Sequence, residues 1–253
     1  MFVCDVKSGV EISIGERRLS CGTKLMVVSF CGSESLADWA CNITMFLTHA
    51  VEDVGLGRSE HMRTVRVREA QGRVHAGFMW RWRCMRYKVL RTLHGLSPGR
   101  ILITGHSMGG ALASLSAHEI ADALPSADVS VITFGAPMAA DAVFNGHDRP
   151  TNLVESVRCV HAGDFVQRLP PLPSYTHDSS AELVLVGTNA NAARRFIGMD
   201  DSQHTWAPWL PVSLIQQLQR AWRGRFGIAA HEVFAYRRAI NTGDIQCTKS
   251  MVQ

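Results

Sequence analysis

The chain has 253 residues, of which 46% are hydrophobic and 19% are charged. This composition excludes an intrinsically disordered chain, and the length suits one folded domain spanning residues 1–253. The formal net charge of +4 is small and mostly spread along the sequence, so nothing indicates a nucleic-acid-binding protein.

The cysteines and the N-terminal segment indicate the cellular compartment in which we expect the protein. The seven cysteines include no Cys-x-x-Cys pair and no zinc-ligand spacing, so we expect neither a disulfide framework nor a metal site. Cys31 and Cys159 lie in apolar runs and are expected to be small buried side chains. The sequence has no signal-peptide pattern and no apolar run of about 18 residues, which predicts a cytoplasmic protein without a transmembrane helix.

Strand and helix patterns alternate along the chain. Four apolar runs rich in β-branched residues predict buried strands: Leu25–Phe30, Arg100–Thr104, Val129–Phe134 and Val154–Val160. Helical patterns occur at Gly77–Leu93, Met108–Leu124, Pro137–Phe144, Pro211–Trp222 and Ala229–Ile240. The alternation predicts an α/β fold with a mostly parallel central sheet and helices on both faces.

Basic and aromatic residues alternate in the first of these helices. Between Arg81 and Arg91, five basic residues are interleaved with Trp82, Tyr87 and Leu90, and Trp80 precedes them. Such a segment is either an ordinary solvated helix face or a face that contacts anionic lipid headgroups. The sequence leaves both interpretations open.

A serine lies between the second predicted strand and a long apolar helix. Residues 105–109 read Gly-His-Ser-Met-Gly, the Gly-x-Ser-x-Gly pattern of a nucleophile elbow. In this tight turn Gly105 and Gly109 leave room for the backbone, and Ser107 projects its hydroxyl. The backbone N–H of Met108, at the helix N-terminus, faces the developing oxyanion. Ser107 is therefore the predicted nucleophile.

The nucleophile needs a base and an acid, and in this fold the chain order is Ser, Asp or Glu, then His. Asp164 follows the strand Val154–Val160 through a short turn, which favours it as the acid. Its rival, Asp141, lies three residues inside a predicted helix, where a solvated side chain is expected. His177, His204 and His231 are the histidines beyond these acids.

At these residues the chain resembles the class 3 lipases, a family of triacylglycerol lipases, feruloyl esterases, phospholipases A1 and diacylglycerol lipases. The matching segments, in the family's order, are VVSFCGSESLADW at 27–39, VHAGF at 74–78, GHSMGGALA at 105–113, TFGAP at 133–137 and the run from Asp164 through Pro171. The resemblance implies an α/β-hydrolase fold. Cys31 stands where the family usually has Arg, which affects the bonds that steady this loop.

The resemblance also assigns roles to further residues. It implies that the backbone N–H of Ser33 is the second oxyanion donor, opposite Met108. It favours His231 as the base, with His204 as the alternative, and it makes His177 a structural histidine. Residues 39–75 include Met45-Phe46-Leu47, where the family carries a lid; these residues are either a lid or part of the core.

The expected function is hydrolysis of acyl-lipid esters through a Ser-His-Asp triad and an acyl-enzyme, without a metal or organic cofactor. The predicted partner is an ester or acyl-lipid substrate, with transient contact to a lipid interface. A soluble carboxylesterase or acyltransferase with the same triad is one alternative. A catalytically silent hydrolase-fold binding scaffold is another.

Overall fold

The computed structural model describes residues 2–5, 10–31, 47–49, 72–146, 149–161, 164–178, 181–185 and 194–198. Its centre is an eight-stranded sheet with the order β1-β2-β3-β6-β7-β8-β9-β10. The strand bounds are β1 Phe2–Asp5, β2 Val10–Arg18, β3 Lys24–Phe30, β6 Arg100–His106, β7 Asp128–Phe134, β8 Leu153–His161, β9 Ala181–Leu185 and β10 Arg194–Gly198.

The five central strands β3, β6, β7, β8 and β9 run parallel to one another. The pairs β1–β2, β2–β3 and β9–β10 are antiparallel and form the two sides of the sheet. The mostly parallel sheet is as predicted, and all four predicted strands are present. Because parallel strands end at the same edge, the segments that follow β3, β6, β7 and β8 meet there.

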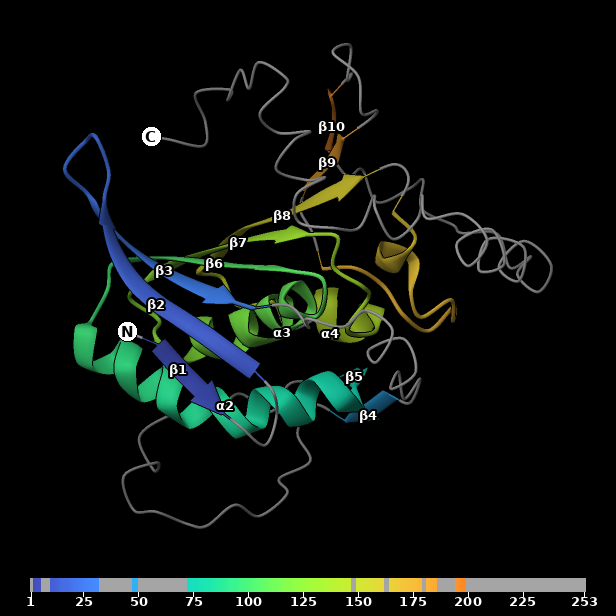
Figure 1. The fold of residues 1–253 in the computed structure, drawn as a ribbon, viewed down its shortest axis with the longest axis horizontal. Helices are drawn as coiled ribbons and strands as arrows, with labels where there is room; N and C mark the ends of the chain where they lie inside the picture. Colours follow the sequence, from blue (N-terminus) through green and yellow to red (C-terminus); the bar gives the residue numbers. More distant parts are fainter. Residues whose placement is uncertain are drawn as a thin grey trace.

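Three helices lie on one side of this sheet: α2 (Ala76–Leu96), α3 (Met108–Ala123) and the short α4 (Ala142–Gly146) (Figure 1). Helix α3 packs against β6 and β7, and α2 packs against α3. The predicted helices at Pro211–Trp222 and Ala229–Ile240 lie outside the described residues.

The sequence of α2 explains both its limits and its position. At its start, the Nδ1 atom of the N-cap His75 accepts a hydrogen bond from Phe78 N at 3.3 Å. It ends where Ser97 adopts the left-handed conformation, with φ 44° and ψ 56°. Its buried residues recur at helical spacing and form one side of the helix: Phe78, Met79, Trp82, Met85, Val89, Leu90 and Leu93. Trp82 and Leu90 therefore belong to the core, not to the basic face.

The predicted helix at Pro137–Phe144 is wrong in its first half. Ala140 instead forms isolated antiparallel bridges with Val74 and with Thr176. The N–H of Met138 also bonds outside its own segment, to Leu169 O at 2.7 Å. A backbone bonded to two distant segments cannot close helical bonds, so the helix is limited to Ala142–Gly146.

A small ribbon lies beside the start of α2. Strand β4 (Leu47–His49) pairs antiparallel with β5 (Arg73–His75), and Leu47 is opposite His75. Both strands belong to the expected lid segment, and the residues between them lie outside the described residues.

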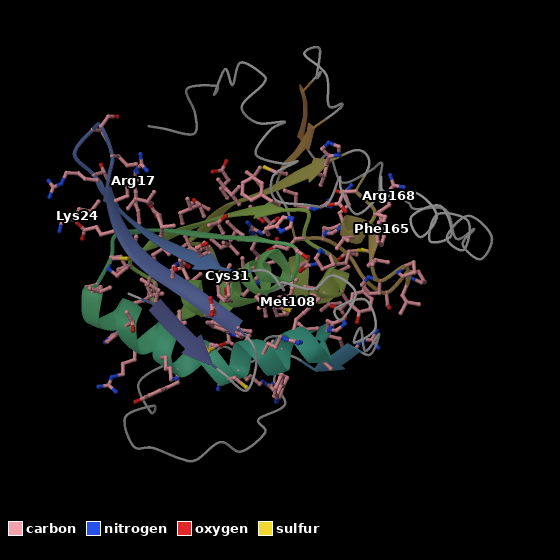
Figure 2. The ribbon with its side chains drawn as sticks, in the orientation of Figure 1. Arg17, Lys24, Cys31, Met108, Phe165 and Arg168 are labelled. Atoms are coloured by element: carbon pink, nitrogen blue, oxygen red, sulfur yellow. The ribbon has the colours of Figure 1, made fainter. Side chains whose placement is uncertain are left out.

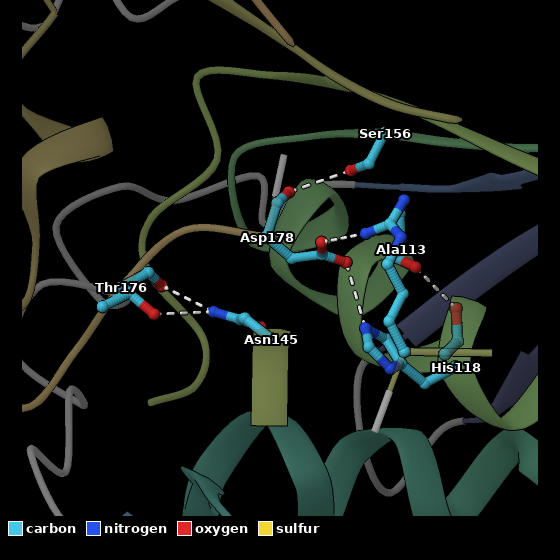
Figure 3. Close-up of polar contacts among 8 residues, drawn as sticks. Ala113, His118, Asn145, Ser156, Thr176 and Asp178 are labelled. Atoms are coloured by element: carbon cyan, nitrogen blue, oxygen red, sulfur yellow. Dashed lines mark hydrogen bonds and ion pairs between the residues drawn. The ribbon is translucent and has the colours of Figure 1, made fainter. Parts of the chain in front are cut away.

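A buried cluster of polar side chains ties α3 to β8 far from the elbow. The Oδ2 atom of Asp178 lies 3.0 Å from His118 Nε2, and its Oδ1 atom contacts Arg149. The backbone oxygen of Asp178 accepts a hydrogen bond from Ser156 Oγ at 2.9 Å (Figure 3). The ring of His118 also packs on Phe144, with centroids 4.5 Å apart. Because His118 is eleven residues along α3 from Ser107, the cluster is about 16 Å from the elbow.

Candidate active site

Ser107 forms a sharp turn between β6 and α3. Its backbone has φ 57° and ψ −127°, a strained conformation for a residue with a Cβ atom. The turn is held from two sides, because Ser107 N–H donates to Phe134 O at 2.9 Å and Ser107 O accepts from Gly110 N at 2.9 Å. The residue is 3% exposed, so it is enclosed by the surrounding chain.

The glycines around this turn have no room for a side chain. A Cβ atom on Gly105 would lie 2.3 Å from the Gly109 backbone, and one on Gly109 would lie 2.4 Å from Phe30 O. On Gly110 it would lie 2.7 Å from the Cβ atom of Ala136. The first turn of α3 therefore touches the ends of β3, β6 and β7 together, which is the close packing expected of a nucleophile elbow.

Met108 is the first residue of α3, where backbone N–H groups have no partner within the helix. The end of β3 lies beside it: Cys31 and Met108 are close together in Figure 2, and Cys31 O lies 2.8 Å from the Cβ position of Gly109. Ser33, the expected second donor, lies outside the described residues.

Cys31 itself differs from the prediction. It is exposed, whereas Cys159 is buried as expected. The apolar pattern of β3 ends at Phe30, so Cys31 is the first residue past the covered part of the strand. Partial desolvation and the negative charge of Glu11 raise the pKa of the Cys31 thiol, and burial raises the pKa of Cys159 to about 12. Neither sulfur is an activated nucleophile.

Asp164 lies at the same edge, two strands from Ser107. It follows β8, and its N–H donates to His161 O at 2.9 Å. The side chain is buried, with 1% of the residue exposed, and its Oδ1 atom accepts a hydrogen bond from Val166 N at 2.8 Å. The two strand positions are about 10 Å apart, and an imidazole with a hydrogen bond on each side spans about 8 Å.

Asp141, the rival acid, has a different role from the one predicted. It is buried, not solvated, and it precedes α4. Its Oδ1 atom accepts from Phe144 N at 2.9 Å, and its Oδ2 atom lies 3.4 Å from Arg73 Nε. Both carboxylate oxygens therefore have structural partners, since Asp141 caps a helix and binds a strand residue.

The described histidines differ in what their ring nitrogens do. His177 Nε2 donates to Gln167 O at 2.8 Å, and burial together with the charge of Arg158 lowers its pKa well below the usual value. A nitrogen that donates to a backbone carbonyl cannot take a proton from Ser107. Burial also lowers the pKa of His75, to about 4. His204 and His231 lie outside the described residues.

His161, which we did not predict for this site, ends β8 three residues before Asp164. Burial lowers its pKa, and the negative charge of Asp164 opposes that shift. Its position before the acid in the sequence excluded it under the usual order of the triad. The signal available in the sequence was that His161 ends the strand that Asp164 follows.

Among the described residues, no three or more His, Cys, Asp or Glu side chains are grouped so that they could hold a metal ion. In the same part of the chain, no helix has the length and apolarity to cross a bilayer.

The comparisons with known proteins agree with this geometry. The family described as Lipase (class 3) matches residues 27–174, more than half of the chain. This chain belongs to the class 3 lipase family. Among its relatives, LIH1 of Saccharomyces cerevisiae is 26% identical over 76% of this chain and 64% of its own length. Lipase A of Sodiomyces alcalophilus is 32% identical over 58% and 40%.

A third relative is the chloroplastic phospholipase A(1) DAD1 of Arabidopsis thaliana, which is 27% identical over 59% of this chain and 34% of that protein. The chain thus spans less than two thirds of the length of each of these relatives.

Solved structures agree with the fold of the chain. The Rhizomucor miehei lipase–propeptide complex matches with a TM-score of 0.63 at 20% identity, over 79% of this chain and 60% of that one. A triacylglycerol lipase of Penicillium expansum matches with a TM-score of 0.60 at 16% identity, over 77% and 72%. The predicted family and the α/β-hydrolase fold are both confirmed.

Proposed function

We propose that this chain hydrolyses carboxylic esters of acyl lipids, with Ser107 as the nucleophile. The observation that carries the proposal is the strained turn at Ser107, φ 57°, between β6 and the N-terminus of α3. Glycines packed against three strand ends hold this serine in the sharp turn that a nucleophile elbow requires. Membership of the lipase family supports the same reaction.

Asp164 is the proposed acid, and His231 is the proposed base, with His204 as the alternative. The buried Asp164 carboxylate, two strands from Ser107, supports this assignment, because the strand spacing of about 10 Å over two strands leaves room for one imidazole. The structural partners of Asp141 leave Asp164 as the better acid.

The N–H groups of Met108 and Ser33 are the proposed oxyanion donors. The contact between Cys31, which is two residues before Ser33, and the first turn of α3 supports this pair. Loss of one such donor lowers kcat by about a hundredfold or more.

In this mechanism the base takes the Ser107 proton while Oγ attacks the ester carbonyl carbon. The carbonyl electron pair moves onto oxygen, and the two N–H groups bind that oxyanion. Collapse of the intermediate expels the alcohol, which receives the proton from the imidazolium. Water then attacks the acyl-enzyme by the same route, and the carboxylic acid leaves as Ser107 recovers its proton.

Labelling and turnover test the residues. We expect Ser107→Ala to abolish labelling by a fluorophosphonate and to lower p-nitrophenyl ester hydrolysis by about 10⁴-fold or more. His231→Ala, His204→Ala and His161→Asn are compared in the same assays. Full activity in His231→Ala would transfer the role of base to His204 or His161, whichever variant is inactive. Absence of labelling in the intact chain would favour the silent scaffold.

The substrate class needs its own assay. Long-chain and short-chain esters are compared above and below the concentration at which they aggregate. A rise in activity on aggregates of the long-chain ester is the expected result for an enzyme of acyl lipids. Preference for monomeric short-chain esters would instead make the protein a soluble carboxylesterase.

Transient contact with a lipid surface is part of this proposal, and the outer side of α2 is the proposed contact face. Trp80 and Tyr87 are 52% and 42% exposed, and Lys88 and Arg91 are exposed on the same side of the helix. No Asp or Glu occurs on α2. Exposed aromatic rings beside basic side chains complement anionic headgroups.

Vesicle sedimentation tests this face. We expect the protein to pellet with vesicles of anionic phospholipid and to stay in the supernatant with purely zwitterionic vesicles. The double variant Lys88→Glu/Arg91→Glu should lose the pelleting, while Lys24→Glu, on the distant β3, should keep it. Equal binding by the two variants would refute the assignment to α2.

A further inference from the structure

The loop that carries Asp164 is fastened by one side-chain amide. Gln167 Nε2 donates to two backbone oxygens, to His161 O at 2.9 Å and to Asp164 O at 2.9 Å. Gln167 is buried, at 7% exposed. One side chain therefore joins the last residue of β8 to the proposed acid, and it fixes the main chain of Asp164 relative to the sheet.

The two donated bonds require a primary amide. The NH₂ group carries two hydrogens that diverge, so one group can serve two carbonyls. A Glu side chain of the same length would present oxygens to those carbonyls, and Met would present no donor. Few other side chains of this length could make the same pair of contacts.

The third polar position of the amide is its Oε1 atom. It is buried and accepts no hydrogen bond from the part of the chain that the structure describes. Among these residues, the bonds of the amide therefore all run from Nε2 to the main chain of His161 and Asp164.

Other bonds hold Gln167 and the carboxylate in turn. His177, whose ring is neutral, donates from Nε2 to Gln167 O at 2.8 Å, so the backbone of Gln167 is itself fixed. Val166 N–H donates to Asp164 Oδ1 and fixes the direction of the carboxylate. The chain of contacts runs from His177 through Gln167 to the main chain of Asp164.

We infer that Gln167 is a positioning residue for ester hydrolysis, because its amide holds Asp164 at the place where the carboxylate can orient the base. The inference rests on the proposed role of Asp164. A displacement of about 1 Å in such an arrangement lowers turnover by about a hundredfold.

Steady-state kinetics of Gln167→Met and Asp164→Asn test the inference. We expect Gln167→Met to lower kcat by about ten- to a hundredfold with KM within about twofold. The acidic limb of the pH profile of kcat/KM should move to lower pH, because a misplaced carboxylate stabilises the protonated base less. In the double variant Gln167→Met/Asp164→Asn, kcat should be no lower than in Asp164→Asn alone.

Asn152 provides a matched control. Its Nδ2 atom donates to three backbone oxygens, Ala121 O, Leu124 O and Ala127 O, at the opposite edge of the sheet. Asn152→Leu removes an amide clamp far from Ser107, so it should lower the urea midpoint and leave kcat unchanged. If Gln167→Met is not recovered folded, Gln167→Asn, which keeps the amide but is one methylene shorter, should show the same loss of kcat.

The outcomes separate the two hypotheses. Wild-type kcat in Gln167→Met beside an inactive Asp164→Asn would overturn the inference and leave the proposed triad intact. Full activity in Asp164→Asn would refute Asp164 as the acid, and the inference would fall with it. A further loss in the double variant would show that Gln167 acts by another route, which also overturns the inference.

Discussion

The strain at Ser107 leads to a quantitative prediction. Ser107→Ala keeps the Cβ atom and therefore keeps the cost of φ 57° and ψ −127°, about 1–3 kcal/mol. Ser107→Gly removes that strain, but the unfolded chain gains freedom worth about 0.5–1 kcal/mol. The glycine variant should therefore be more stable than the alanine variant by about 0.5–2 kcal/mol. Both variants lack the proposed nucleophile, so we expect both to be inactive.

Urea unfolding followed by circular dichroism measures the difference. With a slope of about 2–3 kcal/mol per molar, the midpoint of Ser107→Gly should be higher by roughly half a molar. Ser97→Gly is the control, because Ser97 also has a positive φ, 44°, but lies exposed at the end of α2. It should gain stability and keep full activity. A Ser107→Gly variant no more stable than Ser107→Ala would refute the strain argument.

Three further predictions concern stability. Gly109→Ala should lower the free energy of unfolding by about 3 kcal/mol in thermal melts, because its Cβ atom would meet Phe30 O, whereas Gly15→Ala, with open space, should change it little. Burial lowers the pKa of His75 to about 4, so the protein should be acid-sensitive. Folding favours the neutral ring, so the contribution of His75 to the free energy of unfolding is complete above about pH 6.5. It is lost as the pH falls toward 4, by about 3 kcal/mol in all. His75→Gln should flatten that dependence in urea titrations at pH 7 and pH 4.5; an unchanged slope would contradict the assignment. Asp178→Asn should destabilise by about 3 kcal/mol, because it leaves Arg149 and His118 without their buried carboxylate, and should keep its turnover number at low temperature.

The parallel centre of the fold could be predicted because its strands are short, apolar and bounded by turn residues. The helix of residues 108–123 was equally clear, since its buried side chains leave almost no polar surface. Strand β2 was missed although Val10, Ile12 and Ile14 alternate with more exposed residues. An antiparallel strand near the side of a sheet has one exposed face, so its pattern differs from the continuous apolar run of a strand that is buried on both faces. Residues 137–141 were misassigned because their bonding partners lie far away in the sequence.

At the site, Ser107 and its glycines could be predicted because the turn itself dictates them. Asp164 followed from its place after a strand. The role of Gln167 could not be predicted, since a glutamine between Val166 and Arg168 has no signature until its two carbonyl partners are brought together. The same applies to Asp141, where a cap and an ion pair depend on a helix that starts later than its sequence indicates.

The crowding at Gly109 and Gly110 has a consequence for how activity arises during folding. The reactive serine acquires its shape only when segments around residues 30, 105 and 136 have come together, because each contributes one wall of the turn. Partly assembled chains with native-like helices should therefore be inert toward a fluorophosphonate. The time course of labelling during refolding would report the closing of the sheet, not the earlier formation of local structure.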